Sequence, residues 1–168
     1  MQQIKELLKE LCKLNEKRSK DINSNIKKFI SQCSKIHKEL QPLSQAASNT
    51  KLFKTFEINP DECYTPLKQI QITFSKDRIA FNALPGITLR IRNRSKPCIE
   101  HRGNELPLKP KFIKDYISNL YRPFLFSSTS YICEHLDEIK YKYKQVIINE
   151  LQEKVKVLQE ESLLIKRK

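Results

Sequence analysis

A chain of 168 residues is long enough for one globular domain with extensions, and its net charge of +13 would attract nucleic acid or an acidic protein. Two glycines are too few to build a glycine-rich phosphate loop, so nucleotide-driven chemistry on a small-molecule substrate is not expected. The five cysteines are an odd number without a CxxC spacing, and they predict no disulfide framework, no metal site and no cofactor.

Membrane association is not expected from the sequence. It contains no apolar run of the length that a membrane span needs, and its first residues lack the apolar core of a signal peptide. We therefore expect an intracellular protein with no membrane partner. The basic tail at 166–168 suits either a localisation signal or cations that complement a helix dipole, and three residues do not distinguish the two.

Residues 2–40 have the pattern of one long helix, because they contain neither glycine nor proline and repeat apolar residues at helical spacing. A first apolar stripe consists of Ile4, Leu7, Leu8, Leu11 and Leu14. A second stripe steps by three and four residues, as a coiled-coil seam does, and the members that we assign to partner binding are Ile26, Phe29, Ile36 and Leu40. Polar residues at 15, 18 and 19 separate the stripes, so the seam either shifts its phase there or opens to water. Pro42 disfavours helix in the residue before it, so the helix is predicted to end near residue 41.

The stretch 67–94 alternates apolar and polar residues with a period of two, which predicts strands with one buried face. Together with residues 51–58 it predicts four strands joined by short turns, and therefore an antiparallel meander. The expected strands are 51–58, 67–75, 78–83 and 87–92. The face expected to form the core consists of Ile70, Ile72, Phe74, Ile79, Phe81, Leu89 and Ile91.

The rest of the chain predicts an irregular crossing followed by two helices. Residues 95–110 hold three prolines and are expected to cross without regular structure, apart from a short extended piece at 98–99. A short amphipathic helix is predicted at 111–121, and a long one from about residue 130 to 165. The long helix carries a second seam, whose members assigned to partner binding are Ile139, Val146, Leu151, Val155 and Leu158. Its far half extends beyond a small sheet and needs another helix, either the N-terminal one or a partner's.

This order of elements resembles that of the RWD domain, the non-catalytic relative of the ubiquitin-conjugating fold. The resemblance covers residues 41–141 and is carried by FEINPDECYTPL, by FNALPGITLRIRN and by Pro97, Pro107 and Pro110. The family's tyrosine–proline signature near the fourth strand is reduced here to Phe81 and Pro85. RWD domains joined to coiled coils resemble kinetochore subunits, so the resemblance implies a chromosome or kinetochore-type assembly in the nucleus. The alternative is a generic α+β protein with coiled-coil helices.

A relation to the ubiquitin-conjugating fold raises the alternative of catalysis, since Cys98 follows the predicted fourth strand, where a thioester cysteine would lie. Such enzymes resemble one another in a His-Pro-Asn motif before that cysteine, whose asparagine stabilises the oxyanion. Residues 93–97 read NRSKP here, so the motif is absent. A nucleophile without its stabilising group is a poor catalyst, and we expect no enzyme and no catalytic residue.

Arg90, Arg92 and Arg94 alternate on one face of the predicted fourth strand, with Lys96 beyond them. Side chains two residues apart project roughly 7 Å apart on the same side, close to the spacing of phosphates along a nucleic-acid strand. This face therefore predicts an anionic partner, either nucleic acid or an acidic protein. The competing interpretation is a solvent face whose charges keep the sheet edge soluble.

Together these patterns predict an α+β fold with an N-terminal coiled-coil helix at 1–41, a small RWD-like domain at 42–126 and a C-terminal coiled-coil helix at 127–168. The expected function is a non-catalytic structural subunit that forms a hetero- or homodimer through its helices and binds other proteins through its sheet. The alternative is a basic nucleic-acid-binding protein that uses the arginine face. Whether the two long helices pair within the chain or between chains stays open.

Overall fold

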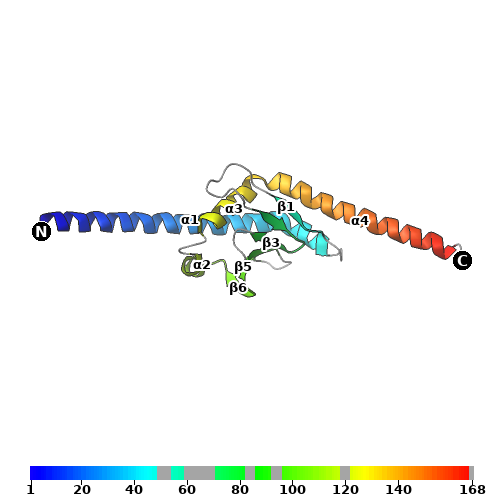
Figure 1. The fold of residues 1–168 in the computed structure, drawn as a ribbon, viewed down its shortest axis with the longest axis horizontal. Coiled ribbons are helices and arrows are strands. Elements are labelled where there is room, and N and C mark those ends of the chain that lie inside the picture. The colour runs from blue at the N-terminus through cyan, green and yellow to red at the C-terminus, as the bar shows by residue number, and fades with distance from the viewer. Residues whose placement is uncertain (49–53, 59–70, 82–85, 92–95, 118–121, 167–168) are drawn as a thin grey trace.

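The computed structural model describes residues 1–48, 54–58, 71–81, 86–91, 96–117 and 122–166. It confirms an α+β fold in which a long N-terminal helix, an antiparallel sheet and C-terminal helices follow one another (Figure 1). The long helices are α1 (Gln2–Ser48) and α4 (Leu136–Lys166), and their outer ends project from opposite ends of the molecule. No helix in the described part of the chain has the length and apolarity needed to cross a membrane.

The sheet is an antiparallel meander, as predicted, but the expectation of four strands is wrong. Among the described residues, six strands lie in chain order, each paired antiparallel with the next. They are β1 (Phe56–Ile58), β2 (Ile72–Phe74), β3 (Arg78–Phe81), β4 (Ile87–Arg90), β5 (Cys98–His101) and β6 (Asn104–Pro107). Strands β1 to β4 lie inside the four predicted ranges. Strands β5 and β6 are additional and lie within residues 95–110, which we expected to be irregular.

The hairpin of β5 and β6 depends on a tight turn at Arg102 and Gly103. Both residues have positive φ angles, 49° and 87°, as the two central residues of a type I′ turn require. The Arg102 amide also donates a hydrogen bond to the carbonyl of Gly86 at 3.1 Å, which ties this turn to the start of β4. The sequence signal was weak because arginine seldom adopts positive φ, and three nearby prolines indicated a loop.

Helix α1 continues through Pro42 to Ser48, so the predicted end near residue 41 is wrong. A proline inside a helix removes a backbone hydrogen bond and costs about 3 kcal/mol or more. Packing of the following turn compensates, because Ser44 and Ala47 are buried. The Ser44 hydroxyl also lies within hydrogen-bonding distance of two carbonyls, those of Lys76 and Ile91. Tertiary contacts therefore outweigh the local preference of Pro42.

Three helices follow the sheet. The predicted short helix is confirmed as α2 (Pro110–Ile117), which begins on a proline where no backbone donor is needed. The predicted long helix begins earlier than residue 130 and is divided into α3 (Arg122–Glu134) and α4. The break falls at His135, whose ring stacks on Tyr131 with centroids 4.0 Å apart. Because of this break, α3 and α4 follow different directions (Figure 1).

One hydrophobic core joins the sheet to the inner halves of the long helices. Six of the seven residues predicted for the core face of the sheet are buried, and the seventh, Ile70, lies outside the described residues. Helix α1 contributes its face from Ile26 to Ala47, and α4 contributes Leu136, Ile139, Tyr143 and Ile147. Each long helix therefore has one half that packs in the core, the C-terminal half of α1 and the N-terminal half of α4, and one half that lies outside it.

A buried polar cluster fastens both long helices to the turn between β2 and β3. Tyr143 of α4 is fully buried, and its hydroxyl lies 2.8 Å from the carbonyl of Ser75 and 2.9 Å from that of Lys76. Ser44 of α1 lies 2.7 Å from the carbonyl of Ile91 and also approaches Lys76. Burial raises the pKa of the Tyr143 phenol, so the hydroxyl keeps its proton for donation.

Replacement of Tyr143 by phenylalanine tests this cluster. Tyr143→Phe removes the donor to the carbonyls of Ser75 and Lys76, so we expect the free energy of unfolding to fall by about 0.5–1.5 kcal/mol. The matched control is Tyr141→Phe on the same helix, where the side chain is 64% exposed and the change should stay within about 0.5 kcal/mol. Urea unfolding measures both, and equal stability of the two variants would contradict the role of the cluster.

Candidate partner-binding surfaces

The residues predicted for the N-terminal seam lie in the chain's own core. Ile26, Phe29, Ile36 and Leu40 are at most 3% exposed. Helix α3 lies on this part of α1, where Gln32 accepts a hydrogen bond from Thr129 at 2.8 Å and donates one to Ser130 at 2.9 Å. The assignment of these four residues to partner binding is therefore corrected: the heptad spacing reflects packing against α3, α4 and the sheet.

The C-terminal seam is divided between core and solvent. Ile139 is buried in the core and Val146 is half-buried, so Ile139 joins the corrected assignments. Leu151, Val155 and Leu158 are 46%, 54% and 64% exposed. These three residues remain available to a partner. The division falls where α4 leaves the sheet, near Ile147.

The exposed part of α1 carries the first apolar stripe, for which the sequence pattern alone indicates no role in partner binding. Its members, all 54–58% exposed, are Ile4, Leu7, Leu8, Leu11 and Leu14. At about 100° per residue, this stripe lies on roughly the same face of α1 as the buried residues further along. The face that α3 and α4 cover in the domain therefore continues uncovered toward the N-terminus. We call residues 2–21 the α1 extension and residues 148–166 the α4 extension.

The two extensions do not cover each other within the chain. Figure 1 shows them leaving the sheet in opposite directions, with the two termini at opposite ends of the molecule. Their inner halves are held together instead, because Lys140 of α4 pairs with Glu39 of α1. That pairing lowers the pKa of the Glu39 carboxyl. Within the described residues, the alternative of an intramolecular pair of extensions is therefore excluded.

The predicted arginine face is not an exposed row of charges where the structure describes it. Arg90 is only 8% exposed and is paired with Glu100 and with Glu105, the latter at 2.9 Å. These carboxylates come from β5 and β6, the two strands that the sequence did not reveal. Arg90 is thus corrected from a partner-binding residue to a structural one, while Arg92 and Arg94 lie outside the described residues.

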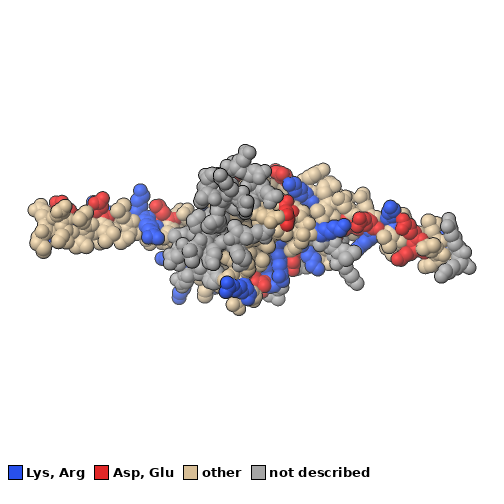
Figure 2. Space-filling view, in the orientation of Figure 1, with Lys and Arg blue, Asp and Glu red and all other residues tan. Residues whose placement is uncertain are grey.

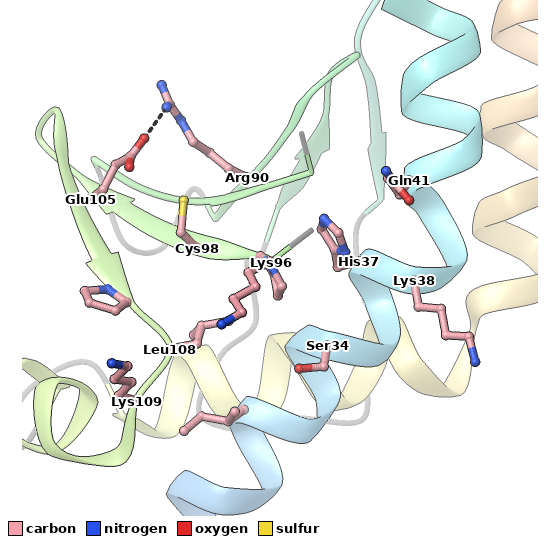
Figure 3. Close-up of a pocket in the computed structure, with 13 residues that line it drawn as sticks. Ser34, His37, Lys38, Gln41, Arg90, Lys96, Cys98, Glu105, Leu108 and Lys109 are labelled. Atoms are coloured by element: carbon pink, nitrogen blue, oxygen red, sulfur yellow. Dashed lines mark hydrogen bonds and ion pairs between the residues drawn. The ribbon is translucent and has the colours of Figure 1, made fainter. Parts of the chain in front are cut away.

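Lys96 is exposed, and it lines a pocket of about 950 Å³ between α1 and the β5–β6 hairpin (Figure 3). From α1 the pocket receives Ile30, Ser34, His37, Lys38 and Gln41. The other side is formed by Arg90, Lys96, Pro97, Cys98, Glu105, Pro107, Leu108 and Lys109. Lys38, Lys96 and Lys109 add positive charge, while Arg90 is offset by its carboxylate partners. The lining suits an anionic group attached to an apolar segment.

Charges on the long helices do not form a single-sign surface on the face that Figure 2 shows. Both basic and acidic side chains appear along each extension in that view. A continuous phosphate-binding surface would require cations of one sign along its length. On this face the basic side chains are therefore interspersed with acidic ones and do not form a continuous basic surface.

The described residues hold no group of three metal-ligating side chains. Cys98 lies in β5, opposite Arg90 in the strand register, and lines the pocket. Burial raises the pKa of the Cys33 and Cys133 thiols, which disfavours the nucleophilic thiolate form of both. Comparison of the chain with protein-family models, curated proteins and solved structures found no match.

The ion-pair cluster predicts a large effect of replacing Arg90. Arg90→Met leaves Glu100, with a side chain 13% exposed, without its cation, and we expect a loss of about 3–5 kcal/mol in the free energy of unfolding. Adding Glu100→Gln to that variant removes the unpaired charge and should restore most of the loss. Denaturant unfolding measures both variants. If Arg90→Met alone were as stable as the native chain, the structural role of Arg90 would be contradicted.

Proposed function

We propose that this protein is a non-catalytic structural subunit that pairs with another chain through its helical extensions. The observation that carries the proposal is the apolar surface left uncovered on both extensions, outside a domain that already has a complete core. Contiguous exposed apolar surface of this kind marks interaction sites. The sheet and the inner halves of the helices form a base from which the two extensions project in opposite directions.

The energetics favour burial of the extensions. Full burial of an aliphatic side chain contributes roughly 1.5–3 kcal/mol, and residues that are already half covered gain about half of this. Partner helices that cover the five exposed stripe residues of α1 and the three exposed seam residues of α4 therefore supply several kcal/mol beyond the stability of the domain alone. On α1 the partner would continue the layer that α3 forms further along the helix.

The assembly that we propose is of the chromosome or kinetochore type, with the protein in the nucleus. The support is the resemblance of the element order to RWD domains joined to coiled coils, together with the exposed apolar surface on both extensions. The six-stranded sheet departs from the four strands of that family. The basic pocket beside Lys96 and Lys109 is the second place where a partner with acidic character would bind the domain.

The alternative function is nucleic-acid binding through the arginine face. The pairing of Arg90 with two carboxylates weighs against it, because a cation already neutralised in the fold releases few counterions on binding phosphate. Titration of duplex and single-stranded DNA with the native chain and with Lys96→Ala, at two salt concentrations, separates the two functions. We expect weak binding that Lys96→Ala leaves unchanged; tight, salt-dependent binding lost in this variant would favour the alternative.

Substitution of two seam residues tests the pairing. In Leu151→Asp/Leu158→Asp, two charges enter the exposed seam of α4, so burial of this surface against a partner becomes unfavourable. The matched control is Val157→Asp/Leu164→Asp, which has the same seven-residue spacing on another face of α4. The exposures match closely, 46% and 64% for the seam pair and 50% and 62% for the control pair.

Each variant is purified with a tag from cells that naturally make the protein, and the mass of the complex is measured by sedimentation. The native chain and the control should travel in a particle heavier than one chain of 19.9 kDa, and the seam variant should lose its partner. Circular dichroism checks that all variants keep the fold. A native chain that sediments alone, or a seam variant that keeps its partner, would contradict the proposed function.

A further inference from the structure

The exposed seam of the α4 extension has a complete heptad register. Ile148, Leu151, Val155, Leu158, Ser162 and Ile165 follow one another at steps of three and four residues. In the usual lettering, the a positions are Ile148, Val155 and Ser162, and the d positions are Leu151, Leu158 and Ile165. All six are exposed, and the five apolar ones are between 42% and 74% exposed. The seam is therefore unoccupied along its whole length.

The residue types at these positions distinguish between ways of pairing. In parallel coiled coils, β-branched residues at a combined with leucine at d favour two strands over three or four. The first two heptads have this arrangement, with Ile148 and Val155 at a and Leu151 and Leu158 at d. Ser162 at the third a position places a small polar residue in the seam, which weakens the pair and restricts its register.

The charges beside the seam are compatible with a second copy of the same chain. In a parallel pair, each g residue lies near the e residue of the next heptad on the other helix. The g residue Glu161 then meets Lys166 of the other copy, an attractive pair that occurs twice by symmetry. The g residue Lys154 meets Gln159 of the other copy, which is neutral. No like charges meet across the seam between these positions.

The seam also avoids the face of α4 that the domain uses. Leu136, Ile139, Tyr143 and Ile147 are buried in the core. At about 100° per residue, the centre of the seam lies roughly a quarter turn away from this buried face. A second helix can therefore lie along residues 148–166 without displacing the sheet or α1 from the first.

From this register we infer that the α4 extension forms a parallel, two-stranded coiled coil with the α4 extension of a second copy of the chain. The inference rests on the proposed function and specifies its partner and its geometry. Parallel pairing places the two domains side by side at one end of the coil, and both α1 extensions remain available to further chains. Because the seam is shorter than three full heptads, the dissociation constant is expected to be on the order of micromolar.

The first test uses the recombinant 168-residue chain with no other protein present. Sedimentation equilibrium over a hundred-fold range of concentration should show a reversible transition from 19.9 kDa to twice that mass. Leu151→Asp/Leu158→Asp should remain monomeric, while Val157→Asp/Leu164→Asp should dimerise like the native chain. A monomer at all concentrations, or a trimer or tetramer, would overturn the inference.

The second test determines the direction of the helices. Ser162→Cys is introduced together with Cys12→Ser, which removes an exposed native thiol, and the dimer is treated with a mild oxidant. Residues at the same a position face each other in a parallel pair, whereas in an antiparallel pair centred on the seam they lie roughly 15 Å apart. We expect a disulfide-linked dimer that is absent from Cys12→Ser alone and from Cys12→Ser/Glu160→Cys, in which the thiol lies opposite the seam. A dimer without the Ser162→Cys cross-link would overturn the parallel arrangement.

The two proposals can fail separately. If the purified chain is monomeric but the particle from native cells is heavier than one chain and sensitive to Leu151→Asp/Leu158→Asp, the partner is a different protein. The proposed function then stands, and the inference of self-pairing is overturned. If the native particle is also a single chain, both fail.

Discussion

The structure depends on the burial of Tyr143 and Ser44 against the turn between β2 and β3. A sheet of short strands cannot stabilise itself, and it needs the apolar faces of helices that arrive from distant parts of the chain. Tyr143 and Ser44 bring α4 and α1 to the same turn, where their buried hydroxyls find acceptors in the backbone carbonyls of Ser75, Lys76 and Ile91. Phe56 packs edge-on against Tyr143 and stacks on Phe74, so the polar cluster is continuous with the apolar core.

This anchoring explains why each long helix has two halves of different character. The apolar core ends at Ile26 on α1 and at Ile147 on α4, where Glu150 is also buried and accepts a hydrogen bond from the Lys54 amide. Both helices nevertheless continue with apolar residues at helical spacing. An extension that served only as a solvated arm would carry polar residues there. The domain therefore leaves two apolar surfaces uncovered, and they project from it in opposite directions.

The role of Arg90 depends on strands β5 and β6, which the sequence pattern did not predict. Arg90 looked like part of a phosphate-binding row because only its own strand was visible in the pattern. The β5–β6 hairpin brings Glu100 and Glu105 onto the same face, and the guanidinium becomes part of the fold. The hairpin depends on Arg102 in a backbone conformation that arginine seldom adopts. The sequence therefore did not predict this turn, which places Glu100 and Glu105 beside Arg90. The same hairpin forms one wall of the pocket that contains Lys96 and Lys109.

The sequence by itself determined the class of fold, the succession of a long helix, an antiparallel sheet and C-terminal helices, and the alternation that buries Ile72, Phe74, Ile79 and Leu89, because periods of two and of about 3.6 residues are local properties of a chain. It also located the helical seams, since heptad spacing is local as well. Only the tertiary structure decided which part of each seam is core, since Phe29 and Leu158 have the same pattern but only Phe29 has elements of its own chain to cover it. It likewise decided that α1 passes through Pro42 and that Arg90 is paired, because both outcomes depend on contacts between residues distant in the sequence. The heptad spacing of α4 can be read from the sequence, and the fold established that its apolar residues from Ile148 onward, unlike Ile139, face outward.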